Sequence, residues 1–252
     1  TRQGDVMKKL LIAFLLTISP LWAFAAGGQG VHLDKANIDP NNVQSLQRGA
    51  AMFVNYCLSC HSASLMRYEH MGKDLGIEET LVSENLIFNG GKIGDLMTVA
   101  TAPADSKVWF GTVPPDLTVI ARARGVDWLY TYLHSFYRDD SRPIGTNNLV
   151  FPDVGMPNVL WELQGVQEPV ITTLKKPDGT EVVEVSLELV EPGLLTPTEF
   201  DRAIRDLVNY LDYMGEPAKH ERRELGTKVI LFLLMFLVLA YLLKREFWKD
   251  VH

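Results

Sequence analysis

The feature that most constrains this chain is the segment Cys57-Leu58-Ser59-Cys60-His61, which contains both of its cysteines. The spacing Cys-x-x-Cys-His is typical of covalent haem attachment, in which two thiols form thioethers to the porphyrin and the adjacent imidazole binds iron. Residues 44–56 place apolar side chains near one face of a helix, which would present the motif to the porphyrin. The sequence therefore predicts one covalently bound haem c.

Other uses of a cysteine pair fit the sequence less well. A pair in an exported protein often forms a disulfide, and Cys-x-x-Cys also occurs in thioredoxin-like sites and in zinc sites. A thioredoxin-like site is expected within a βαβ pattern, and a zinc site needs a second cysteine pair or two closely spaced histidines. The sequence around Cys57 and Cys60 offers neither, so haem remains the prediction.

A second axial ligand has to come from the remaining histidines and methionines. Met156 lies in residues 151–158, where two prolines and a glycine favour an irregular loop able to place a thioether on iron. Met97 is the second candidate, and packing in the core is an alternative role for any methionine. His134 belongs to a helix-like stretch, where a single histidine is more often a surface or core residue.

The N-terminal residues 7–25 have the three parts of a secretory signal. Lys8 and Lys9 precede an apolar run at 10–16, and small residues follow up to Ala25. An uncleaved anchor is the alternative, but the apolar run is short against the about 20 residues that span a bilayer. We therefore expect export, with cleavage after Ala25.

The C-terminal part predicts a membrane anchor. Residues 229–243 are all apolar, and flanking residues extend this run to an anchor at 228–244, although a buried helix of a soluble protein is an alternative. The basic tail, 245–252, is expected in the cytoplasm by the positive-inside rule. The polar residues 218–227 would then link the anchor to a haem domain, 26–217, in the periplasm.

The charge of the exported part narrows the choice of partners. Residues 26–227 contain 17 lysines and arginines against 28 aspartates and glutamates, a formal charge of −11. Nucleic acid is therefore excluded as an expected partner, because it binds cationic surfaces. Such a field favours basic protein partners, although it also serves solubility.

The pattern along the chain predicts a mainly α fold with a small β-hairpin insertion. Pro177-Asp178-Gly179 separates two strand-like runs, and Thr196 with Glu199 forms a capping box at the start of an amphipathic helix. Further helices are expected at 78–88 and 117–124. Arg124 lies near the end of the latter, where it either complements the helix dipole or neutralises a haem propionate.

Taken together, these segments closely resemble the cytochrome c1 family, the haem subunits of the bacterial cytochrome bc1 complex (ubiquinol–cytochrome c oxidoreductase). The resemblance covers essentially the whole mature chain. It rests on the haem motif with the following Ser62 and Arg67-Tyr68, on Pro114-Pro115-Asp116-Leu117-Thr118 with Arg122-Ala123-Arg124, on Gly155-Met156-Pro157, and on the C-terminal anchor.

The resemblance implies a specific site. Cys57 and Cys60 would carry the thioethers, His61 and Met156 would be the axial iron ligands, and Arg124 would pair with a propionate. The chain departs from the mitochondrial pattern at residues 108–111, which are apolar here where an acidic segment is expected.

The resemblance also implies a function. The chain would be the electron-relay subunit of the enzyme in a bacterial inner membrane, passing electrons from a Rieske iron–sulfur protein to a c-type cytochrome, with quinol chemistry on a cytochrome b subunit. Two alternatives are an independent membrane-tethered shuttle to a terminal oxidase and a haem enzyme with an open iron face. A compact domain of about a hundred residues would suit the shuttle, and a bound Met156 would exclude the open face.

Overall fold

The computed structural model describes residues 31–99, 101–175 and 181–249 of the 252. Residues up to His32 form a separate unit, and the elements below belong to the unit that begins at Leu33. The expected signal at 7–25 and its cleavage site lie outside the described residues.

Two long helices, α2 (Val43–Tyr56) and α9 (Pro197–Gly215), pack against each other at the centre of the domain. A Cβ on Gly49 would lie 2.1 Å from the Asp206 carbonyl oxygen, so only glycine allows this approach. Arg48 next to it donates to both carboxylate oxygens of Asp206, at 2.6 and 3.0 Å. The predicted helix at 44–56 and the predicted capping box of Thr196 and Glu199 are both confirmed.

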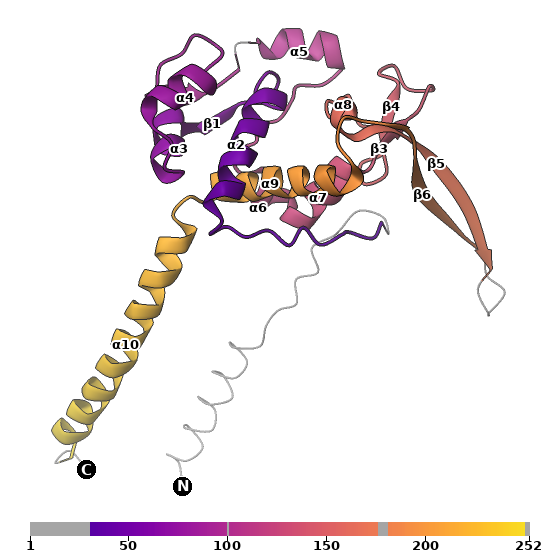
Figure 1. The fold of residues 1–252 in the computed structure, drawn as a ribbon. Coiled ribbons are helices and arrows are strands. Elements are labelled where there is room, and N and C mark those ends of the chain that lie inside the picture. Colours follow the sequence, from indigo (N-terminus) through magenta and orange to yellow (C-terminus); the bar gives the residue numbers. More distant parts are fainter. Residues whose placement is uncertain (1–30, 100, 176–180, 250–252) are drawn as a thin grey trace. The chain divides into compact units, whose positions relative to one another are not determined.

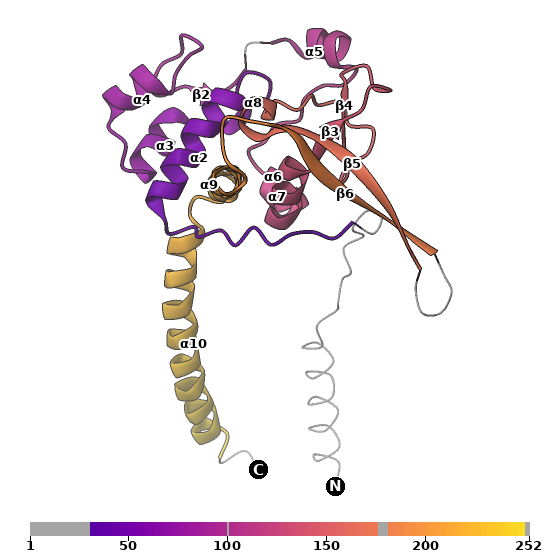
Figure 2. The ribbon, with the colours of Figure 1, turned by 45° about the vertical axis from the view of Figure 1, so that its right-hand side comes forward.

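A second pair of helices covers the other side of α9, as Figure 2 shows with α9 seen end-on. These are α6 (Ile120–Arg124) and α7 (Val126–His134), which Gly125 separates with a positive φ of 89°. The helix expected at 117–124 thus begins three residues late. The delay has a local cause, because the Asp116 carboxylate accepts from the Thr118 amide at 2.9 Å and holds a turn there.

Short helices and strands complete the domain (Figure 1). The helix expected at 78–88 is present but shorter, as α4 (Glu79–Asn85). The remaining short helices are α3 (Tyr68–Asp74), α5 (Pro103–Phe110) and α8 (Trp161–Gln164).

All three described sheets are antiparallel and two-stranded. β1 (Ala63–Arg67) pairs with β2 (Leu96–Met97), β3 (Phe136–Arg138) pairs with β4 (Thr146–Asn148), and β5 (Gly165–Lys175) pairs with β6 (Glu181–Pro192). The last pair is the predicted hairpin. It is longer than the sequence suggested, and Arg138 on β3 forms ion pairs with Glu168 and Glu191 at its base.

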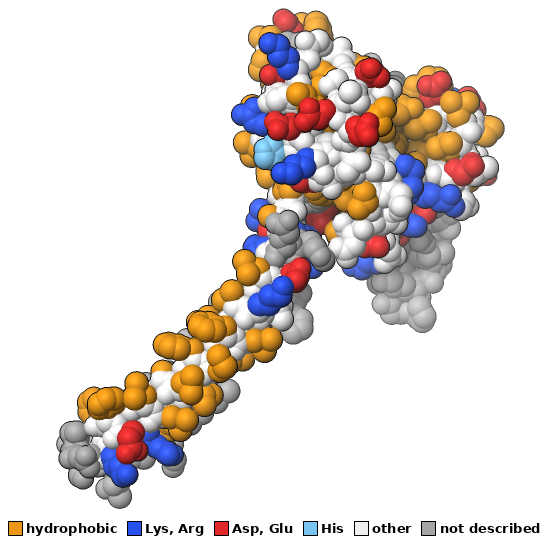
Figure 3. All heavy atoms as spheres, turned by 60° about the vertical axis from the view of Figure 1, so that its left-hand side comes forward, with side chains coloured by type: hydrophobic (Ala, Val, Ile, Leu, Met, Phe, Trp, Pro, Cys, Tyr) orange, Lys and Arg blue, Asp and Glu red, His pale blue; other side chains and the backbone are white. Residues whose placement is uncertain are grey.

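The C-terminal helix α10 runs from Lys219 to Phe247 without a break. The polar stretch expected to link the domain to the anchor is therefore helical from Lys219. In the part of the chain that the structure describes, α10 is the one helix long and apolar enough to cross a membrane, and none of its apolar window is buried. Figure 3 shows hydrophobic side chains along its length and basic ones near both ends. The described residues are thus mainly helical with a hairpin and one C-terminal helix suited to an anchor, as the sequence predicted.

Candidate haem-binding site

One cavity of about 420 Å³ lies between the end of α2, the helices α6, α7 and α9, and the loop around Met156. This volume is within the range of small-ligand sites. All five residues predicted for the site line it, namely Cys57, Cys60, His61, Arg124 and Met156. The rest of the lining is mainly apolar, and includes Phe110, Val113, Leu117, Trp128, Leu129, Leu133, Phe151, Leu207 and Leu211.

The haem motif forms a tight turn at the end of α2. The Cys57 carbonyl accepts from the Cys60 amide at 3.1 Å and from the His61 amide at 2.8 Å. Both cysteines are free thiols, so the disulfide alternative does not describe this fold. The turn keeps two thiols and one imidazole at the same end of the cavity.

The imidazole of His61 is oriented by a backbone carbonyl. Its Nδ1–H donates to the Pro115 oxygen at 2.7 Å, because a carbonyl can only accept. This bond fixes the tautomer and leaves Nε2 for a metal, the arrangement that metal-binding histidines commonly have. Burial lowers the pKa of His61, while the Pro115 bond and the Asp116 charge act in the opposite direction. The imidazole is therefore kept in its neutral, metal-binding form.

The loop that supplies this carbonyl is itself fixed. The Asp116 carboxylate accepts from the Ser64 amide at 2.8 Å, and the Leu117 amide donates to the Ser62 carbonyl at 2.8 Å. Hydrogen bonds from Thr118 and Ser64 lower the pKa of Asp116 against the effect of its burial, which is the largest single influence. Two hydrogen bonds thus join the residues that follow the haem motif to the residues that follow the proline pair.

Met156 lies in the irregular segment between β4 and α8, as its prolines predicted. A Cβ on the preceding Gly155 would lie 3.0 Å from a methyl carbon of Thr112, so a small residue brings this loop close to the opposite wall. The Met156 sulfur accepts a hydrogen bond from the Tyr132 hydroxyl, at 3.3 Å. A thioether and an imidazole therefore face the same cavity.

Met97, the other methionine considered from the sequence, is placed elsewhere. It is fully buried on β2, with its sulfur 3.8 Å from the Tyr210 hydroxyl, and it does not line the cavity. Met156 lines the cavity and Met97 packs in the hydrophobic core, so Met156 is the better placed of the two to bind iron.

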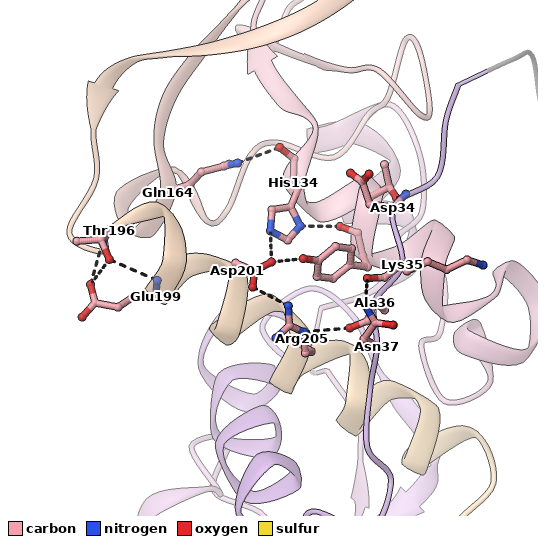
Figure 4. A network of polar contacts seen from close by, with 12 residues as sticks. Asp34, Lys35, Ala36, Asn37, His134, Gln164, Thr196, Glu199, Asp201 and Arg205 are labelled. Atoms are coloured by element: carbon pink, nitrogen blue, oxygen red, sulfur yellow. Dashed lines mark hydrogen bonds and ion pairs between the residues drawn. The ribbon is translucent and has the colours of Figure 1, made fainter.

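His134 also has a role outside the cavity, in the polar network of Figure 4. Its Nδ1–H donates to the Tyr130 carbonyl at 2.8 Å, and its Nε2 lies 3.9 Å from Asp201. Asp201 accepts from the Tyr130 hydroxyl and from Arg205, and Arg205 donates to the Ala36 carbonyl at 3.0 Å. The network joins the segment before α2 to α7 and α9.

Arg124 lies against two aromatic rings at the edge of the cavity. Its guanidinium carbon is 5.0 Å from the Trp128 ring centroid and 5.8 Å from that of Phe151, distances at which cations are attracted to ring faces. It also ends α6, so the helix-dipole role remains compatible with this position. Pro115, Trp128 and Tyr132 were not predicted from the sequence to belong to the site. The four-residue spacing of Trp128 and Tyr132 indicates that the two rings lie together on α7, but it does not indicate a contact with Met156.

The donor set fits a porphyrin-bound iron. Two thiols for attachment, one imidazole nitrogen and one thioether face an apolar cavity with a guanidinium at its edge. Within the described residues, no group of three or more His, Cys, Asp and Glu side chains forms a site for a bare metal ion. His61 and Met156 could thus hold the iron of a group that brings its other ligands in its own macrocycle.

Comparison with known proteins identifies the family. A family model described as the cytochrome C1 family matches residues 35–168 and 179–251. The chain is 51% identical to the cytochrome c1 of Allochromatium vinosum over 98% of this chain and 100% of that protein. It is 49% identical to a Nitrosomonas europaea protein named ammonia monooxygenase gamma subunit, over 98% and 99%. It is 24% identical to a Bradyrhizobium diazoefficiens protein named cytochrome b/c1, over 82% of this chain and 33% of that protein. The chain therefore belongs to the cytochrome c1 family, whose members are haem c proteins that transfer electrons as a subunit of the membrane-bound bc1 complex.

Proposed function

We propose that this chain takes single electrons from a Rieske iron–sulfur protein and passes them to a c-type cytochrome acceptor. The observation that carries the proposal is the convergence of Cys57, Cys60, His61 and Met156 on one apolar cavity. Bound haem c would supply the one-electron redox chemistry. The chain's own residues hold the group, exclude water from it and set the charge around it.

In this proposal the two thiols carry the thioethers, and His61 Nε2 and Met156 Sδ are the axial ligands. Axial His/Met ligation raises the reduction potential of a cytochrome c, because a thioether favours ferrous iron. Burial in an apolar cavity acts in the same direction, since it disfavours the additional positive charge of the ferric state. Both effects suit an electron acceptor that works downstream of quinol oxidation.

Arg124 is proposed to pair with a haem propionate. The guanidinium is held by the faces of Trp128 and Phe151 and lines the cavity, which supports this role over a simple helix cap. A guanidinium presents planar, paired donors that match a carboxylate.

The proposed topology places the haem domain, 26–217, in the bacterial periplasm after removal of the signal at 7–25. The linker at 218–227 leads to an anchor at 228–244, and the tail at 245–252 is cytoplasmic. Lys244, Arg245 and Lys249 support this orientation, because basic residues remain on the cytoplasmic side of a membrane helix.

The proposed partners are a cytochrome b subunit, the Rieske protein and the acceptor cytochrome. Quinol oxidation is assigned to cytochrome b, and this chain carries no catalytic quinol site of its own in the proposal. The formal charge of −11 on residues 26–227 favours an acceptor with a basic surface, since opposite fields accelerate encounter.

Mild detergent extraction of the full chain from membranes tests the proposal. A Rieske protein and a dihaem cytochrome b should purify with it, and quinol should reduce its haem only in that assembly. Purification of the chain alone, with its haem reduced by no Rieske partner but oxidised by a terminal oxidase, would support the independent shuttle instead.

A further inference from the structure

Tyr132 is the polar group that touches the proposed sixth ligand. Its hydroxyl lies 3.3 Å from the Met156 sulfur, its side chain lines the cavity, and the residue is only 9% exposed. A thioether sulfur has two lone pairs, so one can accept this hydrogen bond while the other faces a metal.

The phenol is fixed by its neighbours on α7 and β3. The Tyr132 ring stacks on Trp128, with centroids 4.9 Å apart and planes 9° apart, and meets Phe136 edge-on at 5.1 Å. Trp128 in turn lies beneath the Arg124 guanidinium. The contacts of Arg124 with Trp128, of Trp128 with Tyr132 and of Tyr132 with the Met156 sulfur thus form a continuous row along the cavity wall.

The phenol donates a hydrogen bond to the sulfur only while it keeps its proton. A phenol is protonated at neutral pH, and burial raises the pKa of Tyr132 further. The hydrogen bond draws electron density from the sulfur lone pairs. A sulfur so depleted donates less to ferric iron, which is the more electron-poor state.

We propose that Tyr132 is a positioning residue of the redox site, whose hydroxyl donates to the Met156 sulfur and thereby raises the reduction potential of the iron. This inference rests on the proposed ligation by Met156. It assigns to one hydroxyl a tuning role separate from haem attachment, because Cys57 and Cys60 retain the group whatever happens at Tyr132.

The test compares Tyr132→Phe with Tyr130→Phe in the full-length holoprotein. Tyr130 is on the same helix and loses the same hydroxyl, but its partner is Asp201, outside the cavity. Tyr132→Phe should shift the ferric–ferrous equilibrium toward ferric by about fivefold, the value of one net hydrogen bond, and lower the potential by about 40 mV at 59 mV per tenfold. Tyr130→Phe should leave the potential unchanged.

Binding of added imidazole to the ferric iron distinguishes an electronic effect of the Tyr132 hydroxyl on the sulfur from a structural effect on the Met156 loop. In Tyr132→Phe the sulfur donates more strongly to ferric iron, so imidazole should displace it less readily and bind several-fold more weakly. Tighter imidazole binding would mean that the phenol only braces the loop, and would overturn the proposal, as would equal potentials in the two tyrosine variants. The ferric sulfur-to-iron absorption band of the wild-type protein reports the Met156 ligation separately. Its absence would refute the ligation itself, whereas its presence with no Tyr132 effect would refute only this inference.

Discussion

At the scale of residues, each of the two proposed axial ligands has one hydrogen-bond partner, and the two hydrogen bonds act on the reduction potential in opposite directions. The Pro115 carbonyl accepts a hydrogen bond from His61 Nδ1–H, which makes the imidazole a stronger donor and favours ferric iron. The Tyr132 hydroxyl donates to Met156, which makes the thioether a weaker donor and favours ferrous iron. In the proposed site these two hydrogen bonds would therefore adjust, in opposite directions, a potential that also depends on the ligand types, on burial and on the charge of Arg124.

Arg124→Ala should lower the reduction potential without detaching the haem, because the thioethers are covalent. Loss of the guanidinium leaves a propionate uncompensated, and that negative charge stabilises ferric iron. A pairing worth about 1 kcal/mol corresponds to about 40 mV for one electron. Arg122→Ala is the matched control, since Arg122 lies on the same helix but does not line the cavity. Redox titration of both variants tests whether Arg124 pairs with a propionate. Equal potentials in the two variants would mean that Arg124 only stabilises the end of α6.

The residues of the haem motif were predictable because covalent attachment requires a fixed spacing, and Met156 because its prolines restrict the loop. Tyr132 was not identified, because a tyrosine in an apolar helix has no pattern that distinguishes a hydrogen bond to sulfur from ordinary packing. Pro115 contributes only a backbone oxygen, and side-chain identity carries no information about that.

At the scale of elements, the polar network of His134, Asp201 and Arg205 connects three segments that are far apart in sequence. Asp201 and Arg205 are on α9, His134 ends α7, and Arg205 reaches Ala36 before α2 (Figure 4). The helices α7 and α9, which both line the cavity, are therefore also joined outside it by a network that contains an imidazole.

His134 should make the domain less stable in mild acid. Burial lowers its pKa in the folded state, with opposing effects of Tyr130, Asp201 and Asp34, so below pH 6.5 the unfolded chain binds a proton that the folded one does not. The stabilisation is present above that pH and is lost as the pH falls, by at most about 1.4 kcal/mol per pH unit. Urea unfolding between pH 7 and 5 measures it. His134→Gln should flatten the pH dependence and exposed His70→Gln should not, and equal slopes in all three proteins would refute the assignment.

Elements with a strong local pattern were predicted from the sequence, and elements defined by long-range contact were not. The amphipathic face and capping box of α9 and the sequence Pro177-Asp178-Gly179, which lies outside the described residues between β5 and β6, were sufficient signals. β2 and β4 have only two and three residues, too few for an alternating pattern, so their pairing depends on the tertiary fold. α5 was missed because its apolar residues follow no single face.

At the scale of the whole molecule, the haem domain and the anchor meet in a helical segment. Lys219 and Arg222, in the first turn of α10, form ion pairs with Asp212 at 2.8 Å and Glu216 at 2.6 Å. The sequence predicted a polar linker here, because composition alone does not show whether a charged stretch continues a helix. The start of α10 thus belongs with the haem domain by its contacts.

Truncation after Glu224 should release a soluble domain that retains its haem. Both proposed ligands, the core helices and the ion pairs of Lys219 and Arg222 all precede the cut. Expression with the native signal in a host that attaches haem c, followed by fractionation and haem staining, measures the result. A truncation after Glu216 is the comparison, and should be less stable because it lacks both cations. Failure of the longer form to bind haem would show that the anchor is part of the fold.

The central claim, that Met156 is the sixth ligand of an electron-relay haem, is tested most directly by the ferric absorption band that reports sulfur on iron. Met156→Leu should keep the haem attached, abolish this band and lower the potential, because a thioether stabilises ferrous iron. Met97→Leu, in the core and outside the cavity, should leave the band and the potential nearly unchanged. A band that survives in Met156→Leu and disappears in Met97→Leu would contradict the account and reduce the loop around Met156 to a structural role.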